Sequence, residues 1–328
     1  MNLKPSNNKI LVTGGAGFIG SNLCYELLRL GNKVICMDNL STGKKNNITN
    51  LLNDKNFQFI NADIRNLNDC IKISNGVDYI IHQAALGSVS RSIKDPIKTN
   101  DVNINGFLNM LIAARDNGVK RLIYAASSST YGDSESLPKI EEIIGKPLST
   151  YALTKYVNEL YADVFYRNYG LETIGLRYFN VFGRKQDPSG EYAAVIPKFV
   201  MKLINGDSPI INGDGSYSRD FTYIDNVIQA NLLSITSNNK KAVNTVYNIA
   251  YGERNTLNNL FEYLKKYLSQ FNSKIKNIKV VYGPLRDGDI PHSHASIKKA
   301  MELLNYNPQF SLKDGLKESV KWYWKNYK

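Results

Sequence analysis

The chain has 328 residues, enough for one large domain and a smaller one, and its 43% hydrophobic and 21% charged residues are ordinary for a soluble globular protein. The net charge of +12 comes from basic residues scattered along the whole chain, without the dense cluster typical of nucleic-acid-binding proteins, so we expect no nucleic-acid partner. No apolar run is long enough to span a membrane, and three cysteines without metal-ligand spacing (Cys24, Cys36 and Cys70) indicate reduced thiols in a cytoplasmic protein that has no metal site.

The first half of the chain alternates between strand and helix patterns. A polar start leads directly into the first strand, so we expect no signal peptide. The predicted strands are Lys9–Thr13, Lys33–Asp38, Phe57–Asn61, Val77–His82 and Arg121–Ala126. The predicted helices are Phe18–Leu30, a polar helix from about Lys44, Asn66–Ser74 and Asp101–Asn117. Repeated units of this kind predict an α/β protein with a doubly wound parallel sheet, the Rossmann fold.

The second half begins with a long helix at Thr150–Tyr169 and a strand at Glu172–Arg177, and then becomes irregular and rich in proline and glycine. Short strands and helices follow, ending in an aromatic helix near Lys317–Tyr327. We therefore predict a Rossmann domain over residues 1–180 with a later return near 215–250. A smaller, interleaved α/β domain over residues 181–328 would bind the substrate.

A glycine-rich turn between the first strand and the first helix has the pattern of a dinucleotide site. Gly14, Gly17 and Gly20 permit a tight turn, close approach of a pyrophosphate, and packing of the helix on the sheet. Asp38 ends the second strand, where a carboxylate would bind ribose hydroxyls and repel a 2′-phosphate, which favours NAD over NADP. An ordinary strand–helix turn is the alternative, and the pairing of both signals makes it the weaker one.

Tyr151 and Lys155 are four residues apart on a predicted helix, so both project from one face. Ser127 follows the strand that ends at Ala126, at the edge where a doubly wound sheet binds its ligands. A tyrosine can accept a proton from an alcohol if its pKa falls, and one cation about 4 Å away contributes roughly three pK units at an effective dielectric of 20. Lys155 and a positive nicotinamide ring would supply that charge. Taken alone, a tyrosine and a lysine at this spacing are typical of the exposed face of a helix.

Five longer segments carry a resemblance to a known family. They are HQAALGSVSRS (His82–Ser92), AASSSTYGD (Ala125–Asp133), YALTKYVNELYADVF (Tyr151–Phe165), LRYFNVFGRKQDP (Leu176–Pro188) and INGDGSYSRDFTYIDN (Ile211–Asn226). With the glycine turn, they resemble the extended short-chain dehydrogenase/reductases of the NAD-dependent epimerase/dehydratase family over essentially the whole chain. Within that family the likeness is to bacterial UDP-N-acetylglucosamine C4-epimerases of surface-polysaccharide pathways.

The resemblance implies reversible C4 epimerisation of UDP-N-acetylhexosamines through a 4-keto sugar, with tightly bound NAD. It implies that Tyr151 is the base, Lys155 its pKa-lowering partner and ribose contact, and Ser127 the hydroxyl that orients the substrate. The implied cofactor-binding residues are Gly14, Gly17, Phe18, Ile19, Gly20, Asp38, Asn39, Ser41, Thr42, Gly43, Asp63, Ile64, Gln83, Ala84, Ala85, Asn103, Tyr151, Lys155, Tyr178 and Val181. For Asp63 and Ile64, a place beside the adenine and an ordinary turn are equally compatible with the sequence.

The same resemblance implies a set of contacts to the UDP-sugar. These residues are Gly87, Ser88, Ser127, Ser128, Tyr151, Asn180, Ala194, Val195, Arg219, Arg286, Asp289 and Ser293. Among them Arg219 and Arg286 would clamp the diphosphate, because the guanidinium fork matches phosphate oxygens. Asp289 would accept a hydrogen bond from the uridine ribose.

Ser293 occupies the position where epimerases restricted to non-acetylated sugars carry a tyrosine. A small serine leaves room for an N-acetyl group, so we expect the acetylated pair of sugars to be preferred. Nearby, Ser296 replaces an acidic residue that is frequent in the family, which affects a local helix cap rather than the chemistry.

Several alternatives remain open. A C4-epimerase of UDP-glucose or of a UDP-uronic acid is the closest, since Arg91 could recognise a C6 carboxylate. A sugar-nucleotide 4,6-dehydratase is less favoured, because it needs an Asp-Glu pair where this chain has Ser128 and Ser129. A non-enzymatic NAD-binding protein would typically lose the Tyr/Lys pair, which is intact. The family likeness also implies a homodimer formed through the helices at 101–117 and 151–169.

Overall fold

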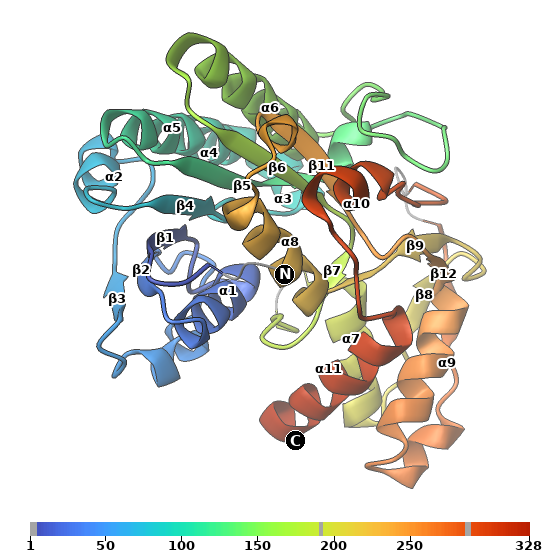
Figure 1. The fold of residues 1–328 in the computed structure, drawn as a ribbon. Helices are drawn as coiled ribbons and strands as arrows, with labels where there is room; N and C mark the ends of the chain where they lie inside the picture. The colour runs from blue at the N-terminus through green and yellow to red at the C-terminus, as the bar shows by residue number, and fades with distance from the viewer. Residues whose placement is uncertain (1–4, 190–192, 286–289) are drawn as a thin grey trace.

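A seven-stranded parallel sheet forms the centre of the computed structural model, which describes residues 5–189, 193–285 and 290–328 (Figure 1). The strand order is β11-β6-β5-β4-β1-β2-β3, and every neighbouring pair is parallel. The strands are β1 (Lys9–Thr13), β2 (Lys33–Met37), β3 (Phe57–Ile60), β4 (Tyr79–His82), β5 (Arg121–Ser127), β6 (Thr173–Tyr178) and β11 (Thr245–Ile249). The predicted doubly wound fold is confirmed, and the order of the strands reverses between β1 and β4, where such sheets bind ligands.

Helices cover both faces of this sheet (Figure 1). In β1, Ile10 and Val12 belong to a core cluster with Leu23 of the helix α1, whereas Leu11 belongs to another with Met110 of α5. The first face carries α1 (Phe18–Arg29) and α8 (Ile224–Thr236), and the second carries α2 (Leu67–Ile73), α5 (Gly106–Asp116) and α6 (Thr150–Tyr169). Since side chains alternate along a strand, apolar residues at every position require cover on both sides.

Two predicted helices differ from the structure. The polar helix expected from about Lys44 is wrong, because the chain forms only the 3₁₀ turns η1 (Lys45–Asn47) and η2 (Thr49–Leu51) there. Asparagine and threonine side chains compete with a helix for backbone groups, and Asn47 Nδ2 donates to the carbonyl oxygen of Ala16 at 2.9 Å. The helix expected at 101–117 begins with a π-helical turn (η3, Asp101–Asn105) before α5. Two short helices, α3 (Val89–Lys94) and α4 (Pro96–Asn100), were not predicted.

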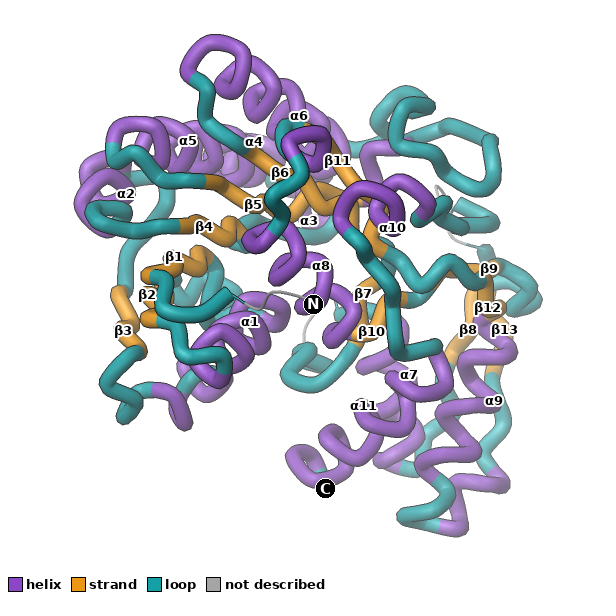
Figure 2. The backbone as a smooth tube through the Cα atoms, viewed as in Figure 1, coloured by secondary structure: helices purple, strands orange, loops and turns teal. Residues whose placement is uncertain are grey.

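The remaining elements form a smaller part beside the sheet (Figure 2). Its helices are α7 (Val195–Asn205), α9 (Leu257–Leu268) and α11 (Leu312–Tyr327), whereas α10 (Lys298–Leu304) packs against β11 and α8. Its strands form three pairs, β7 (Val181–Phe182) with β10 (Thr222–Tyr223), β8 (Ile210–Asn212) with β13 (Val281–Gly283), and β9 (Ser218–Asp220) with β12 (Arg254–Thr256). The chain therefore leaves the sheet after β6 and returns through α8 to β11. Within the described ranges, no helix is both long and apolar enough to cross a bilayer.

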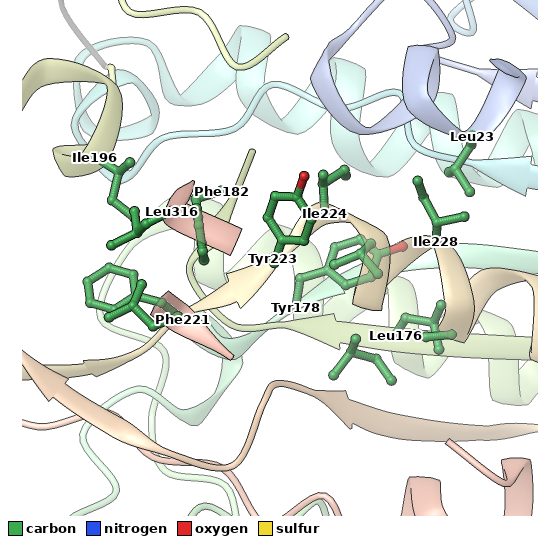
Figure 3. Packing of buried hydrophobic residues seen from close by; sticks show 14 of the residues in the cluster. Leu23, Leu176, Tyr178, Phe182, Ile196, Phe221, Tyr223, Ile224, Ile228 and Leu316 are labelled. Carbon is green, nitrogen blue, oxygen red and sulfur yellow. The ribbon is translucent and has the colours of Figure 1, made fainter. Parts of the chain in front are cut away.

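An aromatic core joins the smaller part to the sheet (Figure 3). The Phe182 ring lies 5.6 Å from that of Tyr223 and 6.4 Å from that of Phe221, measured between centroids. Leu316 of α11 belongs to the same buried cluster as Tyr178 at the end of β6. Burial of this kind favours one fixed placement of the two parts, because interiors are closely packed. The residues that line the cavities between these elements are thereby held in place.

Candidate active site

The turn from β1 to α1 fits only glycine at two of its positions. Gly14 has φ +66°, and a β-carbon there would lie 2.7 Å from the amide nitrogen of Ala84. A β-carbon on Gly20 would overlap the carbonyl oxygen of Gly14. The amides in the first turn of a helix have no partner within that helix. In α1 no side chain caps them either. The arrangement therefore offers a phosphate the free amides and the positive end of the helix.

Asp38 lies directly beside this turn. Its carboxylate accepts hydrogen bonds from the amides of Ala16 at 3.0 Å and Leu40 at 2.8 Å. Burial raises the pKa of Asp38, although both amides oppose that effect. A carboxylate has about four acceptor positions, so it retains capacity for the two hydroxyls of a ribose. Gly43, a predicted cofactor contact, lies against the Asp38 carboxylate. A β-carbon on Gly43 would be 2.7 Å from Asp38 Oδ2.

A cavity of about 390 Å³, which we call the cofactor cavity, opens at the reversal point of the sheet. It is lined by all but two of the residues expected to bind the cofactor, the exceptions being Gly43 and Asn103. Gln83 in its wall donates from Nε2 to Tyr178 Oη at 3.1 Å, while its buried Oε1 has no hydrogen-bond partner among the described residues. A buried acceptor of this kind fits a polar ligand in the cavity. The glycine turn and the carboxylate of Asp38 fit the pyrophosphate and the adenosine ribose of NAD.

Asn103 lies behind the cofactor cavity instead of in its wall. Its side chain accepts from the amide of Leu86 at 2.8 Å and donates to the carbonyl oxygen of Leu86 at 3.2 Å and to Thr154 Oγ1 at 3.1 Å. Thr154 in turn donates to the carbonyl oxygen of Tyr151. With all these groups engaged, Asn103 holds the loop after β4 against α6, and the structure gives it no direct contact to the cavity.

Asp63 lines the cofactor cavity but has little acceptor capacity left. Its carboxylate accepts from Arg65 Nη2 and from Asn39 Nδ2, both at 2.8 Å. The hydrogen bond from Arg65 lowers the pKa of Asp63 to about 2. Arg65 also pairs with Asp101 at 3.1 Å. Arg65 and Asn39 therefore hold the Asp63 carboxylate in this wall of the cavity.

Tyr151, Lys155 and Ser127 line the same cofactor cavity. The helix α6 begins at Thr150 because Ser149 Oγ accepts from the amide of Ala152 at 3.1 Å, and this start places Tyr151 and Lys155 one turn apart. The ammonium of Lys155 donates to the carbonyl oxygen of Ala125 at 2.8 Å. Burial lowers the pKa of Lys155 to about 8. The ammonium is therefore still protonated in most molecules at pH 7.

Within the protein itself, burial controls the direction in which the pKa of Tyr151 moves. Burial raises the pKa of the phenol, and a hydrogen bond with Ser127 opposes that increase only in part. Desolvation disfavours a phenolate because the charge loses its hydration. Base catalysis needs a lower pKa than this, which agrees with the expectation that a positive nicotinamide ring acts together with Lys155.

A second cavity of about 550 Å³, the outer cavity, is lined by Asn180, Val195 and Arg219. Asn180 adjoins Val181 of the cofactor cavity, and its Nδ2 donates to the carbonyl oxygen of Asp220 at 2.9 Å. Ala194 is the residue before α7, next to Val195. Arg219 Nη1 donates to the carbonyl oxygens of Ser218 at 3.0 Å and of Pro291 at 3.1 Å. The structure thus brings together three of the residues expected to contact the UDP-sugar, Asn180, Val195 and Arg219, with Ala194 next to Val195 in sequence. Arg286 and Asp289 lie outside the described residues.

The other expected sugar contacts are placed by backbone geometry. Gly87 lines the cofactor cavity, whereas Ser88, Ser128 and Ser293 line neither cavity. Ser88 has φ +109°, a strained conformation for serine, and its Oγ accepts from the amide of Arg91 as the cap of α3. The Ser293 amide donates to the carbonyl oxygen of Ser218 at 3.0 Å, which places Ser293 beside the strand of Arg219.

Asp220 is a buried carboxylate at this site that the sequence patterns did not single out. It accepts from the amides of Tyr251 at 3.2 Å, Gly252 at 3.3 Å and Ala295 at 3.3 Å. Burial raises the pKa of Asp220 to about 6. Its partners are 31 to 75 residues away in sequence, so no local pattern could have identified it.

Comparison with known proteins agrees with this geometry. The family described as "NAD dependent epimerase/dehydratase family" matches residues 10–250. The chain is similar to a UDP-N-acetylglucosamine 4-epimerase from Methanobrevibacter ruminantium M1 solved with UDP-N-acetylmuramic acid, with 40% identity, a TM-score of 0.91, and coverage of 98% of this chain and 99% of that one. It is similar to the UDP-glucose 4-epimerase of Thermotoga maritima solved with UDP-glucose, with 37% identity, a TM-score of 0.90 and coverage of 98% and 100%. A UDP-glucuronate 4-epimerase from Thermodesulfobacterium geofontis is 35% identical over 322 residues, which cover 95% of each chain.

Proposed function

Since the chain belongs to the NAD-dependent epimerase/dehydratase family and has the fold and cofactor of its nucleotide-sugar 4-epimerases, we propose that it interconverts UDP-N-acetylglucosamine and UDP-N-acetylgalactosamine by inverting C4. The observation that carries this proposal is that Tyr151, Lys155 and Ser127 line one cavity together with the glycine turn and Asp38. The product would serve surface-polysaccharide synthesis in the cytoplasm.

The reaction we propose is redox-neutral overall. Held by the glycine turn and Asp38, NAD would supply a reversible acceptor for the hydride of C4. Tyr151 takes the proton of the C4 hydroxyl and gives it back to the 4-keto sugar after the sugar has turned about its diphosphate. Lys155, held by the carbonyl oxygen of Ala125, places a positive charge on the tyrosine side of the cavity. Ser127 donates a hydrogen bond to the sugar oxygen.

The outer cavity is the proposed site of the UDP moiety. It combines an arginine, Arg219, with the apolar side chains of Phe199, Ile211 and Phe221, which suits a diphosphate joined to a flat base. Asn180 lines the outer cavity, and the next residue, Val181, lines the cofactor cavity. A sugar linked to that diphosphate would therefore reach Tyr151. Arg286 and Asp289 remain predicted contacts to the diphosphate and the ribose.

Ser293 supports the preference for N-acetylated sugars. Its backbone amide donates to the carbonyl oxygen of Ser218, so Ser293 lies beside the strand that carries Arg219. A tyrosine there would take up space that an acetamido group needs. A relative whose own name is UDP-N-acetylglucosamine 4-epimerase is 40% identical to this chain.

UDP-glucose and UDP-glucuronate are the alternative substrates. The relatives named UDP-glucose 4-epimerase and UDP-glucuronate 4-epimerase are 37% and 35% identical to this chain. Arg91 remains a candidate partner for a C6 carboxylate. A 4,6-dehydratase is less favoured, because Ser128 and Ser129 cannot replace the acid and base that eliminate water.

We further propose that the protein is a homodimer. Leu153 and Leu160 of α6 are each 49% exposed and lie seven residues apart, on one face of that helix. Ile97 of the adjacent α4 is 82% exposed. An apolar strip of this kind is typical of a subunit interface. Light scattering of the wild type and of Leu160→Glu tests it, and a monomeric wild type contradicts it.

The experiment that tests the function uses a panel of UDP-sugars, with each mixture followed by NMR to equilibrium. We expect the fastest turnover with UDP-N-acetylglucosamine and UDP-N-acetylgalactosamine, and Tyr151→Phe should lose nearly all of it. Ser293→Tyr should reduce turnover of the acetylated pair selectively. Faster turnover of UDP-glucose or UDP-glucuronate by the wild type would refute the preference, and a product lighter by one water would indicate a dehydratase.

A further inference from the structure

The hydroxyl of Ser127 receives two hydrogen bonds from a single residue. The backbone amide of Ser129 donates to Ser127 Oγ at 3.1 Å, and the Ser129 hydroxyl donates to the same oxygen at 2.8 Å. A serine oxygen has two lone pairs and one proton. Since Ser129 occupies both lone pairs, Ser127 can make its remaining hydrogen bond only as a donor.

The surroundings of Ser127 favour donation of its proton toward Tyr151 and the cofactor cavity. Ser127 ends β5 and is 9% exposed, so little water competes for its proton. It lines the cofactor cavity with Tyr151, and its hydrogen bond with Tyr151 opposes the effect of burial on the phenol. The following 3₁₀ turn, η4 (Ser128–Tyr131), is anchored by Tyr131 Oη, which donates to Asn248 Oδ1 at 2.6 Å. Ser129 is therefore held firmly in its place beside Ser127.

We propose that Ser129 is a positioning residue that fixes the Ser127 hydroxyl as a hydrogen-bond donor, first to the oxygen of Tyr151 and then to the oxygen on C4 of the sugar. This inference rests on the proposed function, since it assigns a role within the same reaction. During hydride loss from C4, the proton of the C4 hydroxyl passes to the Tyr151 oxygen while Ser127 keeps its own proton. No other bond is made or broken by Ser127 or Ser129.

The direction of this hydrogen bond decides which form of Tyr151 is favoured. A donor stabilises the phenolate, the form that can act as a base, whereas a serine free to rotate can accept from the neutral phenol and stabilise that form instead. The amide of Ser129 alone suffices to cap the 3₁₀ turn, so the Ser129 hydroxyl is what completes the donor-only state. Removing that hydroxyl should therefore raise the pKa of Tyr151.

The test compares Ser129→Ala, which keeps the amide and loses the hydroxyl, with Ser129→Thr, which keeps both. We expect the acid limb of the kcat profile of Ser129→Ala to move up by about one pH unit, the effect of losing one hydrogen bond to a charged group. Substrate KM should change little, and Ser129→Thr should restore the wild-type profile. Ser136→Ala removes an exposed hydroxyl that is hydrogen-bonded to Ser134 in the same loop, and serves as the control.

A readout that does not depend on turnover is the titration of Tyr151 itself, followed by NMR of tyrosine labelled with ¹³C at Cζ and assigned with Tyr151→Phe. The proposal predicts a higher pKa of Tyr151 in Ser129→Ala than in the wild type. An unchanged titration, or a loss of rate that is equal at every pH, would overturn it. If the wild type acts on no UDP-sugar, the proposed function fails, while the NMR titration still decides the role of Ser129.

Discussion

The ammonium of Lys185 donates a hydrogen bond of 2.7 Å to the carbonyl oxygen of Asn47, a residue 138 positions earlier in the chain. Lys185 adopts φ +66°, uncommon for lysine, and is buried enough that its pKa is lowered. Asn47 donates to the carbonyl oxygen of Ala16 in the glycine turn. An ion pair of 2.7 Å between Lys44 and Asp187 joins the same two segments. The segment after β7 therefore fastens the loop that borders the cofactor cavity.

Lys185→Met should weaken cofactor retention. The variant loses a hydrogen bond between a charged donor and a backbone oxygen, an interaction of about 1.5 kcal/mol, so we expect NAD to leave roughly tenfold faster. The measurement is the rate of NAD release into an excess of a competing dinucleotide. Lys44→Met, which removes only an exposed ion pair, should have a smaller effect. Lys265→Met on α9 is the matched control, and equal release rates for all variants would contradict the prediction.

Arg177 and Glu159 form a buried ion pair between β6 and α6. The guanidinium donates to the two carboxylate oxygens at 2.9 and 2.7 Å and to the carbonyl oxygen of Glu141 at 2.9 Å. Arg177→Met leaves an uncompensated buried carboxylate, which costs about 3–5 kcal/mol in the free energy of unfolding. The double variant Arg177→Met/Glu159→Met should lose less than the single one, because no charge is left unpaired. Urea unfolding of both variants measures the difference, and additive losses would show that the two charges do not depend on each other.

Asp220→Asn should change how stability depends on pH. Because the pKa of Asp220 is raised to about 6 in the folded protein, against about 3.9 in an unfolded chain, the folded state binds more protons between these values. This carboxyl therefore lowers wild-type stability as pH rises from about 4 to about 6, and has no further effect above that range. The variant lacks this dependence, so its loss of stability relative to the wild type should be larger at pH 4 than at pH 7.

The same substitution has a local cost, because an asparagine NH₂ cannot accept from the amide of Ala295. We expect weaker binding of UDP to Asp220→Asn, measured by calorimetry, since the strand of Arg219 and the segment of Ser293 would be less firmly joined. Glu318→Gln, which changes an exposed carboxylate of the Lys321 ion pair on α11, is the control. A constant stability difference between Asp220→Asn and the wild type from pH 4 to 7 would contradict the assigned burial effect.

The sequence by itself determined the features that depend on local pattern. Apolar runs separated by helical periods predicted the parallel sheet, and the helix at Thr150–Tyr169 has the bounds that its cap and its following glycine indicate. The glycine turn and Asp38 were predictable because their spacing is required by backbone geometry, whatever surrounds them. The three candidate catalytic side chains share one cavity because two are a helical turn apart and the third ends a neighbouring parallel strand.

The tertiary structure alone decided the features that depend on distant partners. Asn103 supports the loop at Leu86, Asp63 is held by Arg65, and Asp220 binds three amides from two other segments. The asparagine-rich stretch after Lys44 forms 3₁₀ turns, and the Asn47 side chain binds the carbonyl oxygen of Ala16 in the glycine turn. Burial also set the direction of the pKa of Tyr151, since desolvation depends on everything packed around a group and on no single residue beside it.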